Sequence, residues 1–229
     1  MSAVSCDKGG VGSAEQLFGT RLPLAARYAD LLTEHGVPRG LIGQREVPRL
    51  WQRHILNSAV VAELIPTGAT VVDVGSGAGL PGVPLALARP DLKVTLLEPM
   101  ARRVAWLTDV VAELGIPLAV VRGRAEEPDV RQRLGGADVV TARAVAPLAK
   151  LAGWCLPLVR PGGRLVALKG ESASDELTRD ADLVRQAGGS ELSVVSCGSN
   201  VLPTPTTVIL VRRDTARTRD GLRPTRKDR

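Results

Sequence analysis

Residues 71–82 read Val71-Val-Asp-Val-Gly-Ser-Gly-Ala-Gly-Leu-Pro-Gly82, an apolar run that leads into a turn rich in glycine. The apolar run predicts a buried strand. Residues without a Cβ let the turn adopt positive φ angles and let a ligand come close to the backbone. A proline after the turn suits the first turn of a helix, where its missing N–H would have no partner. The stretch therefore predicts a strand, a ligand-binding turn and a helix that starts near Leu80.

Two classes of nucleotide site fit this turn. Gly77-x-Gly79-x-x-Gly82 matches the dinucleotide fingerprint. Asp73 makes the longer run Asp-x-Gly-x-Gly-x-Gly, which is typical of class I S-adenosylmethionine (SAM) methyltransferases, where this acid helps to organise the methionine end of the cofactor. Glu98 ends the next apolar strand, and its carboxylate would accept hydrogen bonds from two ribose hydroxyls in either class. Asp73 favours the methyltransferase.

The length and composition indicate one sizeable domain with an appendage. The chain has 229 residues, of which 44% are hydrophobic, and this supports a packed core. It has few aromatic rings for binding RNA by base stacking alone. No run of about 18 apolar residues and no apolar signal core is present. We expect a cytoplasmic protein that does not enter a membrane.

Cysteine usage and charge add two expectations. Cys6, Cys155 and Cys197 are odd in number and widely spaced, so neither a disulfide framework nor a metal site is expected. Much of the net charge of +6 comes from residues 212–229, which carry eight basic and three acidic side chains. Such a tail is either an arm that finds nucleic acid through its phosphates or a disordered, solubilising end.

After residue 66 strands alternate with helices, which predicts parallel pairing through right-handed crossovers. The expected strands are 70–75, 94–98, 118–122, 137–142, 164–169, 191–197 and 206–213. The expected helices are 80–89, 100–114, 126–134, 146–159 and 174–187. The last two strands have no helix between them, and this final hairpin separates class I methyltransferases from dinucleotide-binding folds. The predicted fold class is α/β and Rossmann-like, with a seven-stranded, mostly parallel sheet and a terminal antiparallel hairpin.

An N-terminal helical extension is expected before the sheet. Residues 1–13 are predicted to be disordered, 14–35 to form a helix broken near Gly19 and restarted at Pro23, and 48–65 to form a second helix. An apolar stripe on the second helix is interrupted by two polar residues, and a polar strip lies beside it. The stripe is Val47, Trp51, His54, Ser58, Val61 and Ile65, and the strip holds Arg49, Arg53 and Asn57. Periodicity alone favours a packed, structural His54.

The predicted domain organisation has four parts. They are a disordered N-terminus (1–13), the helical extension (14–66), a SAM-dependent methyltransferase domain (67–213) and a basic disordered tail (214–229).

Five separated motifs together indicate a resemblance to a known family. They are Arg53-His-Ile-Leu-Asn-Ser58, Asp73-Val-Gly-Ser-Gly-Ala-Gly-Leu-Pro-Gly82, Arg122-Gly-Arg-Ala-Glu-Glu127, Thr141-Ala-Arg-Ala144 and Ala167-Leu-Lys-Gly170. In order and spacing, residues 40–213 resemble the ribosomal RNA small subunit methyltransferase G family, also called glucose-inhibited division protein B. The family often has an asparagine where Gly40 stands. The resemblance shifts the interpretation of His54 toward function.

This resemblance implies SAM-dependent methylation of N7 of one guanine in 16S ribosomal RNA, near the decoding site. The implied partner is the 16S RNA or the small ribosomal subunit, and the protein is expected to be a monomer. Each implied cofactor residue follows a strand, where open α/β sheets bind ligands. Gly75 and Leu80 would line the cofactor pocket, Ala125 and Glu126 would bracket the adenine, and Arg143 would close the site.

The chemistry of guanine N7 limits the remaining roles. Its lone pair carries no proton, so methyl transfer needs no general base and relies on proximity. The product purine is cationic, so basic residues should contact phosphates or O6 rather than surround the ring. Arg143, Lys169 and His54 are the candidates for catalysis, and Arg53, Arg124 and Lys169 for RNA contact. Two alternatives stay open: a SAM enzyme with a closed apolar pocket for a small molecule, and a nonenzymatic RNA-binding module.

Overall fold

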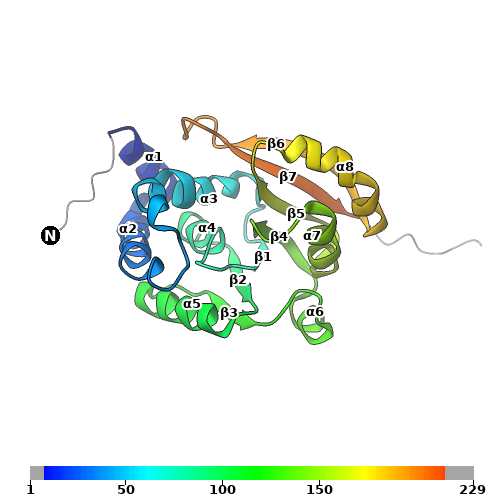
Figure 1. Ribbon diagram of the computed structural model, residues 1–229, viewed down its shortest axis with the longest axis horizontal. Coiled ribbons are helices and arrows are strands. Elements are labelled where there is room, and N and C mark those ends of the chain that lie inside the picture. Colours follow the sequence, from blue (N-terminus) through cyan, green and yellow to red (C-terminus); the bar gives the residue numbers. More distant parts are fainter. Residues whose placement is uncertain (1–7, 215–229) are drawn as a thin grey trace, which may run out of the picture.

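A computed structural model describes residues 8–214 and is built on a seven-stranded sheet (Figure 1). The strand order is β3-β2-β1-β4-β5-β7-β6. Strands β1 to β5 pair in parallel, and β7 pairs antiparallel with both β5 and β6. The predicted sheet with its terminal hairpin is therefore confirmed. The strands are β1 Thr70–Val74, β2 Lys93–Glu98, β3 Ala119–Arg122, β4 Ala137–Arg143, β5 Val159–Lys169, β6 Gly189–Cys197 and β7 Thr206–Arg213.

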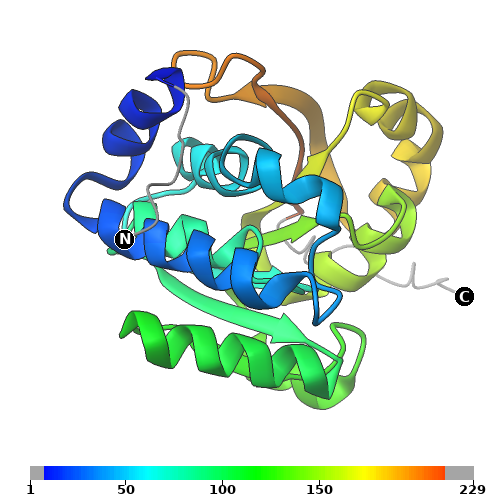
Figure 2. The same ribbon diagram turned by 60° about the vertical axis from the view of Figure 1, so that its left-hand side comes forward.

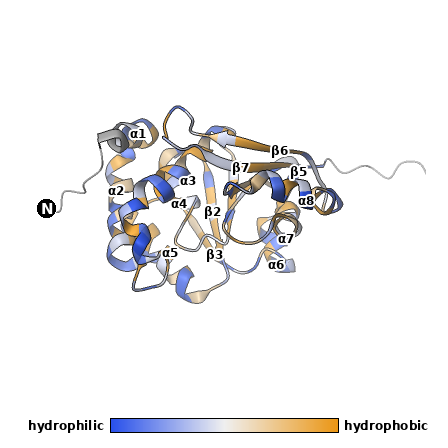
Figure 3. Ribbon diagram, turned by 45° about the horizontal axis from the view of Figure 1, so that its top comes forward, coloured by the Kyte–Doolittle hydropathy of each residue, from blue (hydrophilic) through white to orange (hydrophobic). Residues whose placement is uncertain are grey.

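Helices cover both faces of the sheet (Figures 1 and 2). Those that follow the strands are α4 Gly82–Ala88, α5 Ala101–Leu114, α6 Pro128–Leu134, α7 Leu148–Cys155 and α8 Ala173–Gln186. The apolar residues of α4 and α5 join the N-terminal helices on one face, and those of α6, α7 and α8 cover the other. Helices such as α2 and α5 carry both hydrophilic and hydrophobic residues (Figure 3), as expected when one side of a helix is buried.

Alternation along the strands supplies both cores. Val71 of β1 belongs to the core shared with the N-terminal helices, whereas Val72 and Val74 belong to the core on the opposite face. In β5, Val166 and Leu165 divide in the same way. Successive side chains of a strand point to opposite faces, so a sheet covered on both sides has nearly continuous apolar strands.

The N-terminal extension is helical over a longer range than predicted. Helix α1 spans Lys8–Phe18, so the expected disorder of residues 8–13 is wrong, and residues 1–7 lie outside the described part. The hydroxyl of Ser13 donates to the carbonyl of Val201 at 2.5 Å, which ties α1 to the loop between β6 and β7. The predicted break occurs at Gly19, whose φ is +49°, and α2 follows at Leu22–Leu31.

The second predicted helix is continuous but irregular. It runs through a 3-10 segment Gln44–Arg49, a π-helical segment Leu50–Leu56, the turn α3 Asn57–Ala59 and a 3-10 segment Val60–Leu64. The wider winding changes which side chains face inward, so Leu50 and Ile55 are buried whereas His54 is only half-buried. A fixed period of 3.6 residues could not place these side chains correctly.

Helix and strand boundaries follow the predictions closely, with local exceptions. The helix expected at 146–159 ends as α7 at Cys155 and continues as a 3-10 turn, Leu156–Leu158, that contains Pro157. Strand β5 begins five residues earlier than expected, at Val159, where it pairs with Ala137. Cys155 and Cys197 are buried; Cys6 and the tail after Asp214 lie outside the described residues.

Candidate functional site

The glycine turn between β1 and α4 has positive φ angles at its glycines. Gly75, Gly77 and Gly79 have φ angles of +70°, +56° and +110°. A Cβ at Gly75 would lie 2.8 Å from Cγ2 of Val145, whereas one at Gly77 would have no neighbour closer than 3.7 Å. The left-handed backbone predicted for the turn is therefore present at all three glycines, where other residues would be strained.

The turn is anchored from outside the glycine motif. The carbonyl of Ala78 accepts a hydrogen bond from the Tyr28 hydroxyl at 3.0 Å and another from Trp106 Nε1 at 2.9 Å. Tyr28 belongs to α2 of the extension and Trp106 to α5, and both are buried. The N-terminal extension therefore holds the turn directly.

Asp73 lies beneath the turn and is fully buried. Its Oδ2 accepts from the amide of Gly82 at 3.1 Å, and its Oδ1 accepts from the hydroxyl of Thr141 on β4 at 3.0 Å. The carboxylate thus joins the start of α4 to the neighbouring strand. In this position Asp73 shapes the turn from below.

The buried carboxyl of Asp73 predicts a pH-dependent stability. Burial raises its pKa to about 6 from the ordinary 3.8, against hydrogen bonds from Ser76, Thr141 and Gly82 that lower it. The folded protein therefore holds a proton that the unfolded chain loses, and this contribution to stability is full below about pH 4 and falls as the pH rises to about 6. Relative to Asp73→Asn, the wild type should lose on the order of 3 kcal/mol across that window. Urea unfolding of both proteins between pH 4 and 7 measures the difference, and a difference that does not change with pH would contradict the assignment.

Glu98 closes the turn from the end of β2. Its Oε2 accepts from the amide of Gly77 at 2.9 Å and its Oε1 from the amide of Met100 at 3.0 Å. The side chain is buried. Each carboxylate oxygen has a second lone pair, so the predicted ribose contacts would add to these backbone bonds.

Next to Glu98 lies a hollow of about 160 Å³. It is lined by Gly75, Pro99, Arg124, Ala125, Glu126, Val145 and Trp154, among others. Ala125 is buried and Glu126 is exposed at the rim. The predicted adenine residues therefore lie together, and Trp154 from α7 adds an aromatic ring that the sequence did not single out.

A second hollow, of about 290 Å³, shares Gly75 with the first and extends over the turn. Gly77, Leu80, Arg103, His54 and Arg143 also line it. The Nε of Arg103 is buried without a hydrogen-bond partner in the described chain. The two hollows meet at Gly75, one beside an aromatic ring and the other over the glycine turn with this Nε of Arg103, so the residues present fit the adenine and methionine ends of SAM.

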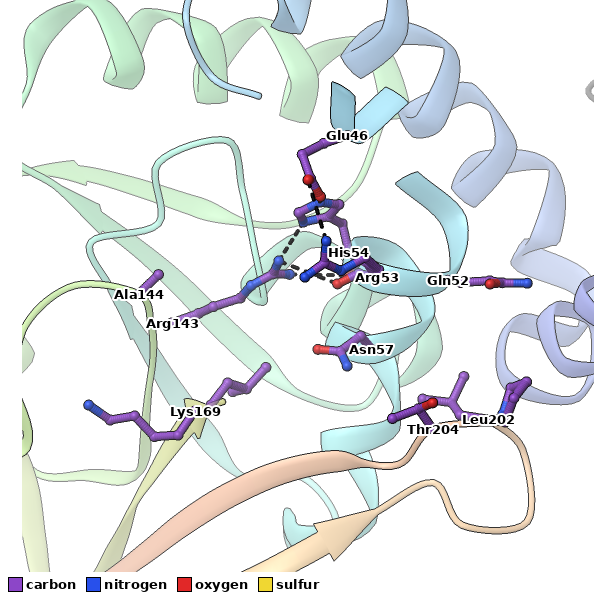
Figure 4. Close-up of a pocket in the computed structure, with 12 residues that line it drawn as sticks. Glu46, Gln52, Arg53, His54, Asn57, Arg143, Ala144, Lys169, Leu202 and Thr204 are labelled. Atoms are coloured by element: carbon purple, nitrogen blue, oxygen red, sulfur yellow. Dashed lines mark hydrogen bonds and ion pairs between the residues drawn. The ribbon is translucent and has the colours of Figure 1, made fainter. Parts of the chain in front are cut away.

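Arg143, at the end of β4, connects the sheet to the irregular helix. Its guanidinium donates to the carbonyls of Arg53 and His54 at 3.4 and 3.3 Å, to the hydroxyl of Ser58 at 3.1 Å and to Nδ1 of His54 (Figure 4). The next residue, Ala144, has a φ of +52°. Such a strained backbone persists only where the surroundings hold it.

A carboxylate from the extension completes this cluster. Oε2 of Glu46 lies 2.8 Å from Nε2 of His54, and its Oε1 lies 3.4 Å from Nη1 of Arg53. Since Nδ1 of His54 accepts from Arg143, Nε2 carries the proton and donates to Glu46. Burial lowers the pKa of His54, with a contribution from Arg143, although Glu46 opposes the shift. His54 is therefore neutral at pH 7.

A third and larger hollow, of about 640 Å³, adjoins the cluster. It shares Glu46, His54, Arg143 and Ala144 with the hollow over the turn. Its remaining lining comes from the irregular helix, the end of β5 and the loop before β7: Gln52, Arg53, Asn57, Leu168, Lys169, Leu202, Pro203 and Thr204. We call it the substrate hollow.

The other predicted basic residues are arranged differently. Lys169 lines the substrate hollow, but its amine donates to the carbonyl of Ala146 at 3.1 Å and to Glu176 at 2.9 Å, and it points away from Arg143 (Figure 4). Arg53 is exposed at the rim. Arg124 is exposed beside the smallest hollow, away from Arg143.

Glu46 and Ser58 are site residues that the sequence did not assign. Ser58 was recognised only as a polar interruption of an apolar stripe, which is a weak signal for a buried hydrogen-bond acceptor. Glu46 lies in a loop-like stretch without periodicity. Only the geometry shows that it contacts both His54 and Arg53.

A protein-family model described as rRNA small subunit methyltransferase G matches residues 21–204. The chain belongs to the rRNA small subunit methyltransferase G family. Curated relatives of that name agree. The one from Salinispora arenicola (strain CNS-205) is 60% identical over 211 residues, covering 88% of this chain and 86% of its own. The one from Rhodococcus jostii (strain RHA1) is 57% identical over 201 residues, covering 88% of each chain.

Solved structures agree on the fold. The SAM-dependent methyltransferase SibL in its apo form has a TM-score of 0.56 at 18% identity and covers 90% of this chain and 74% of its own. Aeropyrum pernix fibrillarin with natively bound SAM has a TM-score of 0.51 at 19% identity, over 68% of this chain and 73% of that one. Both show the class I methyltransferase fold.

Membership of the methyltransferase G family confirms the predicted enzyme class and its cofactor, SAM. Among residues 8–214, no helix is both long and apolar enough to cross a membrane. The same residues hold no group of three or more His, Cys, Asp or Glu side chains suited to a metal ion.

Proposed function

We propose that this protein transfers the methyl group of SAM to N7 of one guanine in 16S ribosomal RNA, near the decoding region, without a general base. The observation that carries the proposal is the meeting of two hollows at Arg143 and Ala144. One follows the glycine turn, and the other is lined by charged and polar side chains. The family to which the chain belongs points to the same activity.

The residues that would hold the cofactor come from the ends of β1, β2 and β3 and from α7. Ala125, Glu126 and Trp154 would enclose the adenine, Glu98 would receive the ribose, and the glycine turn would carry the methionine end. When bound, SAM supplies an electrophilic methyl group on a sulfonium. Arg143 and Ala144, which line both hollows, then define where the donor meets the purine.

Two of the three cationic side chains at the substrate hollow are paired with carboxylates, which suits a product that becomes cationic. Glu46 pairs with Arg53 and accepts from a neutral His54, and Glu176 pairs with Lys169. Arg143 donates to main-chain carbonyls and to the Ser58 hydroxyl. With Arg53 and Lys169 paired, Arg143 is the lining cation without a carboxylate partner among residues 8–214, and it would contact O6 rather than N7. Holding N7 in line with the methyl group accounts for the catalysis.

The features of the substrate hollow favour RNA over a small apolar molecule. Five of its lining residues carry a charge or a titratable ring: Glu46, Arg53, His54, Arg143 and Lys169. These residues do not form the closed apolar pocket that a small-molecule methyltransferase of this composition would need. Exposed Arg53 and Arg124 would contact phosphates, and the protein would act as a monomer.

The test is transfer of tritiated methyl groups from SAM to small ribosomal subunits isolated from a strain that lacks the gene. Nucleoside analysis of the labelled RNA should yield 7-methylguanosine at one position. Label in another nucleoside, or no label on RNA while calorimetry shows SAM binding, would contradict the proposal.

A further inference from the structure

The lining of the substrate hollow falls into two groups of residues. Arg143, Ala144, His54 and Glu46 form the first group, and they also line the hollow over the glycine turn. Asn57 and the loop residues Leu202, Pro203 and Thr204 line only the substrate hollow. The methyl donor therefore reaches the hollow from the Arg143 side, and Asn57 lies on a part of the wall that the cofactor does not share.

Asn57 is held firmly by its backbone. Its N–H donates to the carbonyl of His54, and its carbonyl accepts from the hydroxyl of Thr206 at 3.0 Å. The residues on either side of it, Leu56 and Ser58, are buried. Strand β7 and the irregular helix thus fix the point from which its side chain extends.

The carboxamide of Asn57 is available to a ligand. It is half-buried and makes no hydrogen bond to the rest of residues 8–214. Figure 4 shows it directed into the space between Arg143 and Lys169. Two other lining residues have a carbonyl or carboxylate oxygen in the side chain: Glu46 already accepts from His54 and Arg53, and Gln52 points away from Arg143 and Lys169 (Figure 4).

We propose that Oδ1 of Asn57 accepts a hydrogen bond from the 2-amino group of the target guanine and so selects guanine over adenine. This rests on the proposed function. The N7 and O6 edge must face the methyl donor at the Arg143 end. The opposite edge, which carries N1–H and the 2-amino group, then faces Asn57. Adenine has a nucleophilic N7 as well, but it has no amino group at C2, so it would leave this acceptor unpaired.

The test compares the target guanine with inosine, which keeps N7, O6 and N1–H but lacks the 2-amino group. Small-subunit RNA is assembled with guanine or inosine at the methylated position only. The wild type should lose roughly tenfold in kcat/KM on the inosine substrate. Asn57→Leu should lose roughly tenfold on guanine and treat both substrates alike, whereas Asn57→Asp keeps an acceptor and should keep the preference.

Thermal unfolding and SAM calorimetry check that each variant folds and binds cofactor, since Asn57 lines neither hollow at the turn. A structural role for Asn57 would lower both rates together and leave their ratio unchanged. Equal wild-type rates on guanine and inosine, or a guanine preference retained by Asn57→Leu, would overturn this assignment and leave the proposed function standing. Failure of the wild type to methylate either RNA would overturn both.

Discussion

Replacing Arg143 with alanine should lower methyl transfer about 100-fold, the usual effect of misplacing the reacting groups. The Arg143 guanidinium joins the end of β4 to the irregular helix through bonds to Arg53, His54 and Ser58. Without it, both sides of the junction between cofactor and substrate lose their relative position. Arg143→Ala would also leave the buried hydroxyl of Ser58 without the arginine as hydrogen-bond donor. A small loss of stability should therefore accompany the loss of activity.

The measurement is single-turnover methyl transfer to small subunits at saturating SAM. Arg160→Ala is a matched control because it removes an arginine near the start of β5. This is the opposite edge of the sheet from Arg143, which ends the parallel strand β4. Arg160 pairs with Asp138 at 2.7 Å, its side chain is 49% exposed, and exposed pairs of this kind contribute little. The control should keep full activity. An Arg143→Ala protein with wild-type turnover would remove Arg143 from the site.

Replacing Gly82 with alanine should destabilise the protein by about 3 kcal/mol, as overpacking of a core does. Gly82 begins α4 with ordinary helical backbone, so the cause is space and not conformation. A Cβ there would lie 2.3 Å from Cδ2 of Leu96 and 2.8 Å from Oδ2 of Asp73. Leu96 is fully buried, so any shift of its side chain disturbs the core around it. The clash would also displace the carboxylate that organises the turn, so SAM affinity should fall.

Gly153→Ala is the control for this substitution. Gly153 lies within α7, and a Cβ there would meet no atom within 4 Å. Alanine should therefore leave stability unchanged or raise it by about 0.5–1 kcal/mol. Urea unfolding measures both variants, and calorimetry with SAM measures the affinity. Equal stability of the two variants would show that the core around Leu96 yields more easily than its burial indicates.

The fold could be predicted from the sequence because its signals are local and repeated. Each strand from β1 to β5 contains a short apolar run, and the run that begins at Val71 leads into a turn whose three positive-φ positions are all glycine. The N-terminal region was harder. Its α1 contains Gly9, Gly10 and Gly12, whose helix propensity is low, and it is tied down by a contact between Ser13 and Val201 that lies 188 residues away in the chain. No local pattern contains such a contact.

The same distinction between local patterns and distant contacts applies to the functional site. Residues at the carboxyl ends of strands, such as Asp73, Glu98 and Arg143, could be placed because parallel strands bring these ends to one edge. Lys169 ends a strand too, yet its amine pairs with Glu176 of α8, which a position in sequence does not reveal. Gly40 has a φ of +65°, a conformation that both glycine and asparagine accept, so this backbone explains the residue there as well as any side-chain contact would.

The hydrogen bond from Tyr28 to the carbonyl of Ala78 means that the smallest active enzyme must include α2 of the extension. A chain cut at residue 67 would keep all seven strands, the glycine turn, Asp73 and Glu98, and four of the five motifs. It would also expose the face of α4 and α5 and release one of the two donors that hold Ala78. The catalytic unit therefore includes the N-terminal extension, and a fusion or domain swap that kept only the strands and the glycine turn would join the pieces in the wrong place.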